Sequence, residues 1–459
     1  MQATLAELLP FIAGARLVPG MNGDARFDGV STDSRSVAPG TLFVALRGET
    51  FDAHDFLAQV THCAAVVVEE LPDGWTLPAI LVPDTLVALG QIAHFWRRRF
   101  ALPVIGVTGS NGKTTVKEMI AAILGAAFGV DASLATRGNL NNEIGVPLTL
   151  FRMDPVHRAA VIEMGMNHPG EIARLCAIAA PTLALVNNAQ REHQEFMHSV
   201  AAVARENGAV LAGLAADGIA VFPHGDEFSD VWRSLAGARR VITFGLGPDA
   251  DVSCSYRASE FGNDMQVSVR MDGATLQFPV RLAAAGAHNV LNALAAVACT
   301  FGIGVGIDAI ARGLQAFAPV SGRLQKKRAA NGATLIDDSY NANPDSVRAA
   351  IDVLALAPAP RFLVLGDMGE VGANGPEFHA EIGAYAVARG IQHVLTTGAL
   401  ARHVGGEHFD QFEAMLAALD GHLAGAPGAT VLIKGSRFMK MERAVQHLIA
   451  TKNNNKEVH

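Results

Sequence analysis

A glycine-rich segment in the first third of the chain has the composition of a phosphate-binding loop. It reads Thr-Gly-Ser-Asn-Gly-Lys-Thr-Thr from Thr108 to Thr115 and lies between an apolar run and a helical pattern. Glycines let backbone N–H groups converge on phosphate oxygens, and the following helix N-terminus adds partial positive charge. Lys113 is expected to reach the β- and γ-phosphates, and the Thr114 hydroxyl to complete a Mg²⁺ shell. The expected nucleotide contacts are Gly109, Ser110, Asn111, Gly112, Lys113, Thr114 and Thr115.

This segment matches the general phosphate-loop pattern imperfectly. The pattern has glycine six residues before the lysine, where this chain has Val107, and Gly106 lies one place early. The alternative is a glycine turn followed by a solvated lysine. The position between a buried strand and a helix favours the phosphate loop.

Composition limits the classes of protein to which the chain can belong. Its 459 residues predict two to four domains, and with 50% hydrophobic and 17% charged residues it can bury several cores. A net charge of −8 gives no general attraction to nucleic acid or to an anionic membrane, so an anionic substrate requires a local cluster of positive groups. Four scattered cysteines without a CxxC pair are typical of buried thiols in a reducing compartment. Neither a signal peptide nor a membrane-spanning run is recognised, so we expect a cytoplasmic protein without membrane insertion.

The elements that position the loop fall into three expected α/β blocks. The first block, residues 1–82, is short and strand-rich. The second block, residues 83–317, begins with a helix over about 85–99. There the apolar runs 104–108, 159–162 and 183–186 alternate with helices and predict a parallel sheet covered on both faces. Hairpin-like spacing over about 219–283 predicts an antiparallel extension, followed by a helix near 286–300. In residues 318–459, strands at 334–336, 362–365, 393–396 and 430–433 alternate with helices, as in a small Rossmann-like doubly wound domain.

The variant loop and several other segments resemble the Mur ligases of peptidoglycan synthesis. Gly138–Pro147, Asp338–Pro344 and Lys434–Arg437 are similar to the branch of the family that adds D-alanyl-D-alanine. Thr32–Arg35 and Phe43–Gly48 are similar to the family's UDP-sugar-binding domain. The resemblance spans nearly the whole chain. It implies a small UDP-binding domain, a central P-loop ATPase-like domain and a C-terminal domain that binds the amine substrate.

The resemblance also implies the reaction, the cofactors and the partners. ATP with Mg²⁺ phosphorylates the terminal carboxylate of a UDP-N-acetylmuramoyl tripeptide, and the amine of D-alanyl-D-alanine then displaces phosphate. Phosphoryl transfer between anions is limited by charge repulsion, so a protein contributes cations and in-line positioning. We expect a monomeric enzyme. Whether the third peptide residue is diaminopimelate or lysine stays open.

Two residues are expected at the metal beside Thr114, and with Lys113 they form the expected catalytic set. Glu163 directly follows the apolar run 159–162, where a side chain points into the crevice of an open α/β sheet. By resemblance Glu163 is a Mg²⁺ ligand, the alternative being a solvated or paired carboxylate. His193 lies six residues beyond Asn187, where the family has a histidine on a second Mg²⁺. Imidazole is an unusual ligand for a hard cation, so His193 alone reads as a surface residue.

The clearest departure from the family is at Asn207. Family members usually carry there a lysine that CO₂ carbamylates and that helps to hold the second Mg²⁺, and asparagine cannot be carbamylated. A slip in the assignment would not supply a lysine, because none occurs between Lys117 and Lys326. We hypothesise that Glu192, Glu195 or Glu206 contributes the missing charge.

The remaining assignments concern nucleotide and substrates. By resemblance His288, Asn289 and Asn292 face adenine, with a helix cap and a core histidine as the alternative, and Arg323 and Asp338 complete the nucleotide contacts. Asp367 and Glu370 are expected only to shape the crevice. Ser34 and Arg35 are expected to bind the uridine diphosphate end of the substrate, and Asn139 and Asn142 its sugar–peptide part. The dipeptide with its carboxylate is expected to contact Asn341, Asn343, Lys434, Ser436 and Arg437.

Three alternative functions are considered. The first two are a Mur ligase for a different amino acid and a folylpolyglutamate-type synthase. No DNPR-like motif of a diaminopimelate-adding ligase occurs, and the segments at 338–344 and 434–437 favour the dipeptide ligase. The third is a regulatory protein that kept the phosphate loop and lost catalysis, for which Asn207 is the support. Thr114, Glu163, His193 and Asp338 argue against it.

Overall fold

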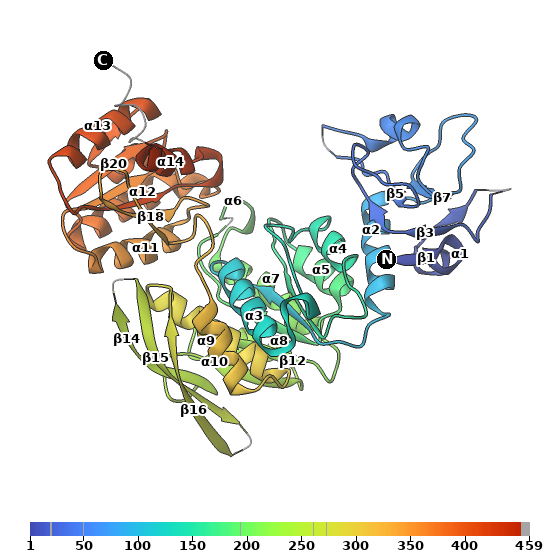
Figure 1. The fold of residues 1–459 in the computed structure, drawn as a ribbon, viewed down its shortest axis with the longest axis horizontal. Helices are drawn as coiled ribbons and strands as arrows, with labels where there is room; N and C mark the ends of the chain where they lie inside the picture. The colour runs from blue at the N-terminus through green and yellow to red at the C-terminus, as the bar shows by residue number, and fades with distance from the viewer. Residues whose placement is uncertain (19–20, 49, 193, 260, 272, 451–459) are drawn as a thin grey trace.

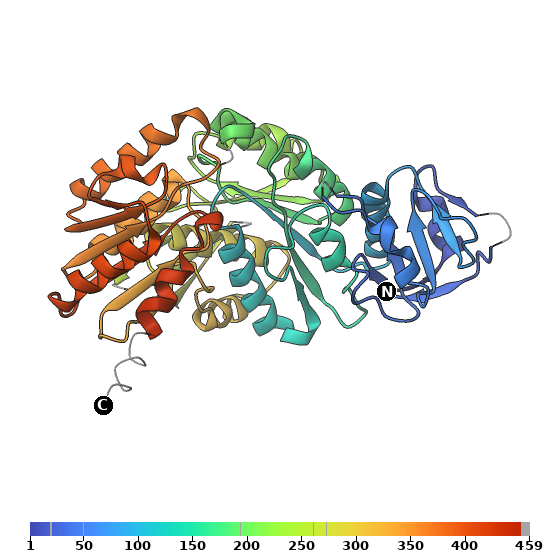
Figure 2. The same cartoon turned by 90° about the horizontal axis from the view of Figure 1, so that it is seen from above.

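The computed structural model describes residues 1–18, 21–48, 50–192, 194–259, 261–271 and 273–450. Within them the strands form four sheets, two in the N-terminal region, one in the centre and one in the C-terminal region (Figure 1). The N-terminal sheets lie at one end, joined to the central sheet through helix α2, and the C-terminal sheet lies at the other end (Figure 2). In the described part of the chain no helix combines the length and apolar character that crossing a membrane requires.

The N-terminal region holds two small sheets. One pairs β1 (Gln2–Thr4) with β3 (Arg26–Asp28), beside the short helix α1 (Leu5–Leu8). The other has the order β2-β7-β6-β5-β4, formed by Arg16–Leu17, Ala79–Leu81, Ala65–Val68, Leu42–Val44 and Val30–Ser31. Strands β5 and β6 are fully buried, as their apolar runs require. Helix α2 (Thr85–Arg97), capped by Asp84, buries Leu89 and Ile92 in a core that continues into the central region.

The central sheet has the strand order β16-β15-β14-β13-β12-β11-β8-β10-β9. Its strands are β8 (Val104–Thr108), β9 (Ser133–Ala135), β10 (Ala159–Glu163), β11 (Leu183–Val186), β12 (Ile219–Pro223), β13 (Arg240–Phe244), β14 (Val252–Ser259), β15 (Gly262–Met271) and β16 (Ala274–Leu282). Along β8, Ile105 and Val107 face one core and Val104 faces the other. Both faces are therefore covered, which is why the strand is continuously apolar.

Helices cover the two faces of this sheet. One core contains residues of α3 (Lys113–Phe128), α9 (Ala287–Gly302) and α10 (Ile307–Ala316). The other contains residues of α4 (Gly145–Leu150), α5 (Glu171–Ala179), α7 (Val200–Ala212) and α8 (Ser229–Ala236), and the short α6 (Gln194–Met197) precedes α7. The helices predicted at 85–99 and 286–300 are confirmed within two residues at each end.

The predicted antiparallel extension begins later than expected. β12 and β13 both pair in parallel, and among the described residues of this sheet the antiparallel ladders join β14 to β15 and β15 to β16. The reason is the segment between β12 and β13. It folds into α8 and buries Trp232 completely, which provides the long crossover that a parallel return needs.

The C-terminal sheet has the order β17-β18-β22-β19-β20-β21, with β17 as an antiparallel edge. Its strands are Gln325–Arg328, Thr334–Asp338, Thr430–Lys434, Arg361–Leu365, His393–Thr397 and Glu407–Phe409 in that order. α11 (Pro344–Leu356) and α12 (Gly375–Ala388) pack on one face, and α13 (Phe412–Ala424) and α14 (Glu442–Ala450) on the other. The four strands predicted here are confirmed.

Candidate active site

A cavity of about 740 Å³ is lined by residues of both the central and the C-terminal sheets. It lies where the parallel strands end, as the crevice rule for open α/β sheets predicts. Most of the residues expected to bind nucleotide or substrate line it. These are Ser110, Asn111, Gly112, Lys113, Thr114, Thr115, Asn139, Asn142, Glu163, Asn289, Asn292, Arg323, Asp338, Asn341, Asn343 and Lys434.

The loop between β8 and α3 depends on two of its glycines. Gly109 has φ +134°, and a Cβ there would lie 2.9 Å from the Asn187 side chain. Gly112 has φ +81°, and its Cβ would lie 2.5 Å from Asn292 Oδ1. A side chain at either position would meet both strain and collision. α3 begins directly after Gly112 without a side-chain cap, so its N-terminus faces the cavity with backbone N–H groups available to an anion.

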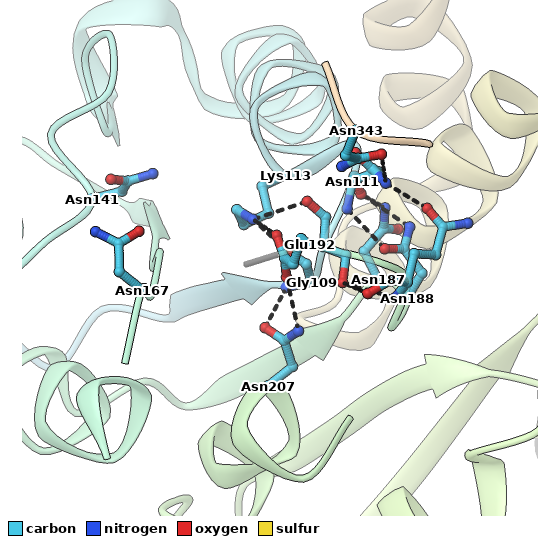
Figure 3. Close-up of polar contacts among 12 residues, drawn as sticks. Gly109, Asn111, Lys113, Asn141, Asn167, Asn187, Asn188, Glu192, Asn207 and Asn343 are labelled. Atoms are coloured by element: carbon cyan, nitrogen blue, oxygen red, sulfur yellow. Dashed lines mark hydrogen bonds and ion pairs between the residues drawn. The ribbon is translucent and has the colours of Figure 1, made fainter. Parts of the chain in front are cut away.

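Lys113 curls back over this loop. Its ammonium donates to the carbonyl oxygens of Gly109 and Ser110, the latter at 3.1 Å, and lies 3.4 Å from Glu192 Oε2 (Figure 3). Its side chain keeps 16% of its surface exposed toward the cavity it lines. The positive charge is thus held at the mouth of the loop, where phosphate oxygens would approach.

Glu163 carries a buried oxygen that the protein does not satisfy. Its Oε1 accepts hydrogen bonds from Thr114 Oγ1 at 3.2 Å and Asn141 Nδ2 at 2.9 Å. Its Oε2 is buried and has no hydrogen-bond partner among the described residues. Burying a carboxylate oxygen without compensation is costly, and a cation at that position would remove the cost.

This donor set fits Mg²⁺ bound together with a nucleotide. Mg²⁺ is normally held by one or two carboxylates plus substrate phosphates and waters, rather than by a protein cage. No cluster of three or more His, Cys, Asp and Glu side chains suited to a metal occurs among the described residues. The Thr114 hydroxyl and Glu163 Oε2 are the groups that would hold the ion. His193 lies outside the described residues.

Asparagines that follow β11 hold the loop in shape, and sequence analysis did not assign them. Asn187 Nδ2 donates to the Asn111 carbonyl at 2.8 Å and to Asn292 Oδ1 at 2.9 Å. Asn188 Oδ1 accepts from Asn111 N, and its Nδ2 donates to the Asn111 carbonyl, both at 2.9 Å (Figure 3). Their position directly after an apolar run could have indicated this role. Neighbouring parallel strands end at one edge of a sheet, so residues that follow β11 lie close to the loop that follows β8.

The amides of Asn289 and Asn292 are engaged within the protein. Asn289 Nδ2 donates to the Ala285 carbonyl at 2.8 Å, and Asn292 Nδ2 donates to Asn289 Oδ1 at 3.1 Å. Both residues line the cavity, so they brace its wall next to the half-buried His288. Burial, followed by the nearby Lys434 charge, lowers the pKa of His288 to about 4, which keeps the ring neutral at physiological pH.

On the C-terminal side a buried ion pair organises the wall. Lys434 Nζ donates to Asp338 Oδ2 at 2.5 Å and to the Asn341 carbonyl at 2.8 Å. Burial raises the pKa of Asp338, and the Lys434 charge opposes that shift. Arg323 lies 4.1 Å from the centroid of the Tyr340 ring. Lys434 therefore shapes the wall through Asp338 while it lines the cavity.

Some expected residues lie outside the lining of this cavity. Ser34 and Arg35 belong to the N-terminal region, where the exposed Arg35 guanidinium binds Asp33 through bonds of 2.8 and 2.9 Å. The Ser436 hydroxyl is buried, accepts from Gly369 N at 2.6 Å and donates to the Ala342 carbonyl. Arg437 is exposed and pairs with Glu442 at 3.0 Å.

The acidic residues proposed to compensate for Asn207 lie in different surroundings. Glu192 lines the cavity beside Lys113. Glu195 is exposed on α6. Glu206 accepts from the backbone N–H groups of Gly170 and Ile172, both at 2.9 Å, and so caps the start of α5. Asp367 accepts from the N–H groups of residues 399–401 and thus shapes a turn.

Comparison with known proteins gives the same result at every level. Residues 107–300 match the Mur ligase middle domain, and residues 322–437 match the Mur ligase, glutamate ligase domain. The chain is 40% identical over 459 residues to the UDP-N-acetylmuramoyl-tripeptide--D-alanyl-D-alanine ligase of Escherichia coli (strain K12), covering 98% of each chain. The ligase of the same name from Bacillus subtilis (strain 168) is 34% identical, with 92% of this chain and 93% of the relative covered.

Solved structures agree with these relatives. MurF from Acinetobacter baumannii superposes with a TM-score of 0.91 at 33% identity, covering 98% of this chain and 99% of that one. The MurF ligase from Thermotoga maritima, solved in complex with ADP, gives a TM-score of 0.81 at 26% identity, covering 91% and 96%.

Proposed function

The chain belongs to the Mur ligase family, and we propose that it joins D-alanyl-D-alanine to the terminal carboxylate of a UDP-N-acetylmuramoyl tripeptide, with ATP as the phosphoryl donor. The E. coli relative that carries this reaction in its name is similar over nearly the full length of both chains. The observation that carries the mechanism is the buried, unsatisfied Glu163 Oε2 beside Thr114, at the start of the helix that follows the phosphate loop.

The reaction proceeds in two balanced steps. The tripeptide carboxylate attacks the γ-phosphorus of ATP, the bond from that phosphorus to the β-bridging oxygen breaks, and ADP leaves. The dipeptide amine then attacks the acyl carbon, inorganic phosphate departs with the C–O bonding pair, and the nitrogen loses a proton. The products are an amide, ADP and phosphate.

The described residues divide this work between them. The α3 N-terminus and Lys113 supply the positive charge that two approaching anions require. We propose that Thr114 and Glu163 hold Mg²⁺, which when bound neutralises charge on the phosphate oxygens. Asn141 keeps Glu163 Oε1 oriented through its 2.9 Å hydrogen bond, so that Oε2 stays turned to the ion.

The remaining assignments are extensions of this proposal. We assign residues 1–82 to the UDP-sugar-binding domain, 83–317 to the ATP-binding domain and 318–459 to the domain for the amine substrate. Ser34 and Arg35 would then act at the far end of the long substrate, away from the cavity. We also propose that the protein acts as a monomer.

A cytoplasmic location is proposed from the substrates and the thiols. ATP and nucleotide-linked sugars are cytoplasmic metabolites, and all four cysteines are buried with free thiols. Burial raises the pKa of Cys176 and Cys254 to about 11, so these thiols stay protonated and inert.

A coupled assay tests the proposed function. Phosphate release is measured with the UDP-muramoyl tripeptide while amino acids and dipeptides are scanned as the second substrate. D-Alanyl-D-alanine is expected to give the fastest release by at least tenfold. Release at one rate whichever amine is supplied would contradict the ligase assignment.

A further inference from the structure

Glu192 lies beside the phosphate loop, in the segment that follows β11. Its side chain is 6% exposed and lines the cavity. Its Oε1 lies 3.5 Å from Asn207 Nδ2, and its Oε2 lies 3.4 Å from Lys113 Nζ (Figure 3). Both distances are at the long end of the hydrogen-bonding range. The carboxylate is thus a buried negative charge in the wall of the cavity, beside the loop where a cation bound with phosphate would lie.

Asn207 fixes the orientation of this carboxylate. Its Oδ1 accepts from the N–H of Gly109 at 3.0 Å, and its backbone carbonyl accepts from Thr108 Oγ1 at 3.1 Å. Because Oδ1 is committed to an N–H donor, the NH₂ group of the amide must face the other way, toward Glu192. The amide is 1% exposed and neutral. Asn207 thus ties Glu192 to the start of the loop without adding charge.

The other two candidates for the missing charge are committed elsewhere. Both oxygens of Glu206 accept backbone N–H groups at the start of α5. Glu195 is exposed on α6. Of the three carboxylates, only Glu192 is both buried and part of the cavity lining.

We propose that Glu192, oriented by Asn207, is the second carboxylate of the nucleotide–metal site, so that this chain binds its metal without a modified lysine. The inference rests on the proposed function. Glu163 and Glu192 then give the two carboxylates that, with phosphate oxygens and waters, are typical of a nucleotide-bound Mg²⁺. Oε2 already faces a cation, the Lys113 ammonium, which shows that this oxygen lies in a position that accepts positive charge.

Metal-dependent nucleotide binding tests the proposal without relying on turnover. The affinity of a non-hydrolysable ATP analogue is measured by calorimetry with Mn²⁺ and again in EDTA, and the ratio of the two gives the metal enhancement. For Glu192→Gln the enhancement is expected to fall at least tenfold, while the affinity in EDTA stays within threefold of wild type. Glu195→Gln makes the same chemical change three residues away and is expected to keep the enhancement within twofold.

The outcomes separate the inference from the proposed function. A wild-type protein that shows no metal enhancement would contradict the proposed function itself. An unchanged metal enhancement in Glu192→Gln would overturn the inference. An equal loss of affinity with Mn²⁺ and in EDTA would also overturn it, because Glu192 would then act on Lys113 alone.

A second variant keeps the test decisive if Glu192→Gln unfolds, as thermal unfolding would report. Glu192→Asp retains the charge but withdraws it by one methylene group. Its enhancement is expected to fall severalfold, less than in Glu192→Gln, with binding in EDTA again preserved. Full enhancement in Glu192→Asp together with full enhancement in Asn207→Ala, which frees the carboxylate from its orienting amide, would also overturn the proposal.

Discussion

Asn111 in the phosphate loop and Asn343 at the start of α11 exchange two hydrogen bonds. Asn343 Nδ2 donates to Asn111 Oδ1 at 2.9 Å, and Asn111 Nδ2 donates to Asn343 Oδ1 at 3.3 Å. The same Asn343 Oδ1 accepts from Ser346 N at 2.8 Å and so caps α11. The loop that would hold the nucleotide and the first helix of the C-terminal region are therefore positioned by one side chain. A movement of the C-terminal region toward the phosphate loop and the binding of nucleotide to that loop should therefore affect each other.

Arg191 provides the stronger connection between the same two regions. Its guanidinium binds Asp345 at 2.6 Å and Glu381 at 2.7 Å, and it is 22% exposed. Charge-assisted hydrogen bonds of this kind contribute about 1.5–3 kcal/mol each. For Arg191→Ala we expect a larger radius of gyration in solution scattering and a KM for the dipeptide raised about tenfold or more, with unfolding temperature nearly unchanged.

The matched control for Arg191 is Arg402→Ala. Arg402 pairs with Asp410 at 3.5 Å on the exposed surface of the C-terminal region, where an ion pair contributes little. It is expected to leave scattering and kinetics unchanged. Equal effects of the two variants would show that Arg191 does not connect the regions.

Lys113→Ala tests the phosphate loop. The ammonium makes its contacts with loop carbonyls and Glu192, so its loss removes positive charge from the site without opening a core. Turnover should fall at least a hundredfold while circular dichroism and unfolding temperature remain those of the wild type. Retention of more than a tenth of the wild-type rate would contradict the assignment.

Glu163→Gln separates function from stability. Gln can keep an oxygen toward Thr114 and Asn141 while placing an NH₂ group where the unsatisfied Oε2 lies. Removing an uncompensated buried charge is neutral or stabilising, so the unfolding temperature should stay level or rise. Turnover should fall at least a hundredfold, and the concentration of Mg²⁺ required should increase. A clear loss of stability with turnover preserved would show that Glu163 is structural.

Local patterns in the sequence predicted the fold because a central strand is covered by helices on both faces of its sheet. Val104, Ile105 and Val107 are continuously apolar because cores lie on both faces, and this marks a central parallel strand. The position of Glu163 at the end of an apolar strand predicted that its carboxylate would face the crevice. It lies there beside Thr114, since β8 and β10 pair in parallel and end at one edge. The course of β12 and β13 was missed because short strands separated by a polar segment resemble hairpins.

Contacts between distant residues could not be predicted in the same way. The pairing of Lys434 with Asp338 joins residues 96 positions apart, and nothing in either segment indicates that the lysine is engaged within the protein. Which of Glu192, Glu195 and Glu206 supplies charge to the metal site depends on what each side chain contacts in the folded protein. Only the packed structure shows that Glu206 caps α5 and that Glu192 lies in the cavity.

The neutral amide at Asn207 predicts insensitivity to CO₂. No lysine occurs between Lys117 and Lys326, so this region offers no amine that CO₂ could convert to a carboxylate ligand at that position. At limiting Mg²⁺, the rate in CO₂-depleted buffer is expected to equal the rate after bicarbonate is added, within experimental error. A severalfold rise on adding bicarbonate would show that a carbamate forms elsewhere in the chain and contributes to the metal site.

His288 predicts how stability depends on pH. Burial and the nearby Lys434 lower its folded pKa to about 4, against 6.5 as the ordinary value, and Asp352 opposes the shift. Between these two values the unfolded chain takes up a proton that the folded chain refuses, so stability decreases as pH falls from about 6.5 to about 4. His288→Gln removes this proton uptake. Its unfolding temperature should therefore fall less steeply than that of the wild type over the same range, whereas replacing the exposed His403 by Gln should leave the wild-type slope. Parallel curves for the wild type and His288→Gln would contradict the lowered pKa of His288 in the folded protein.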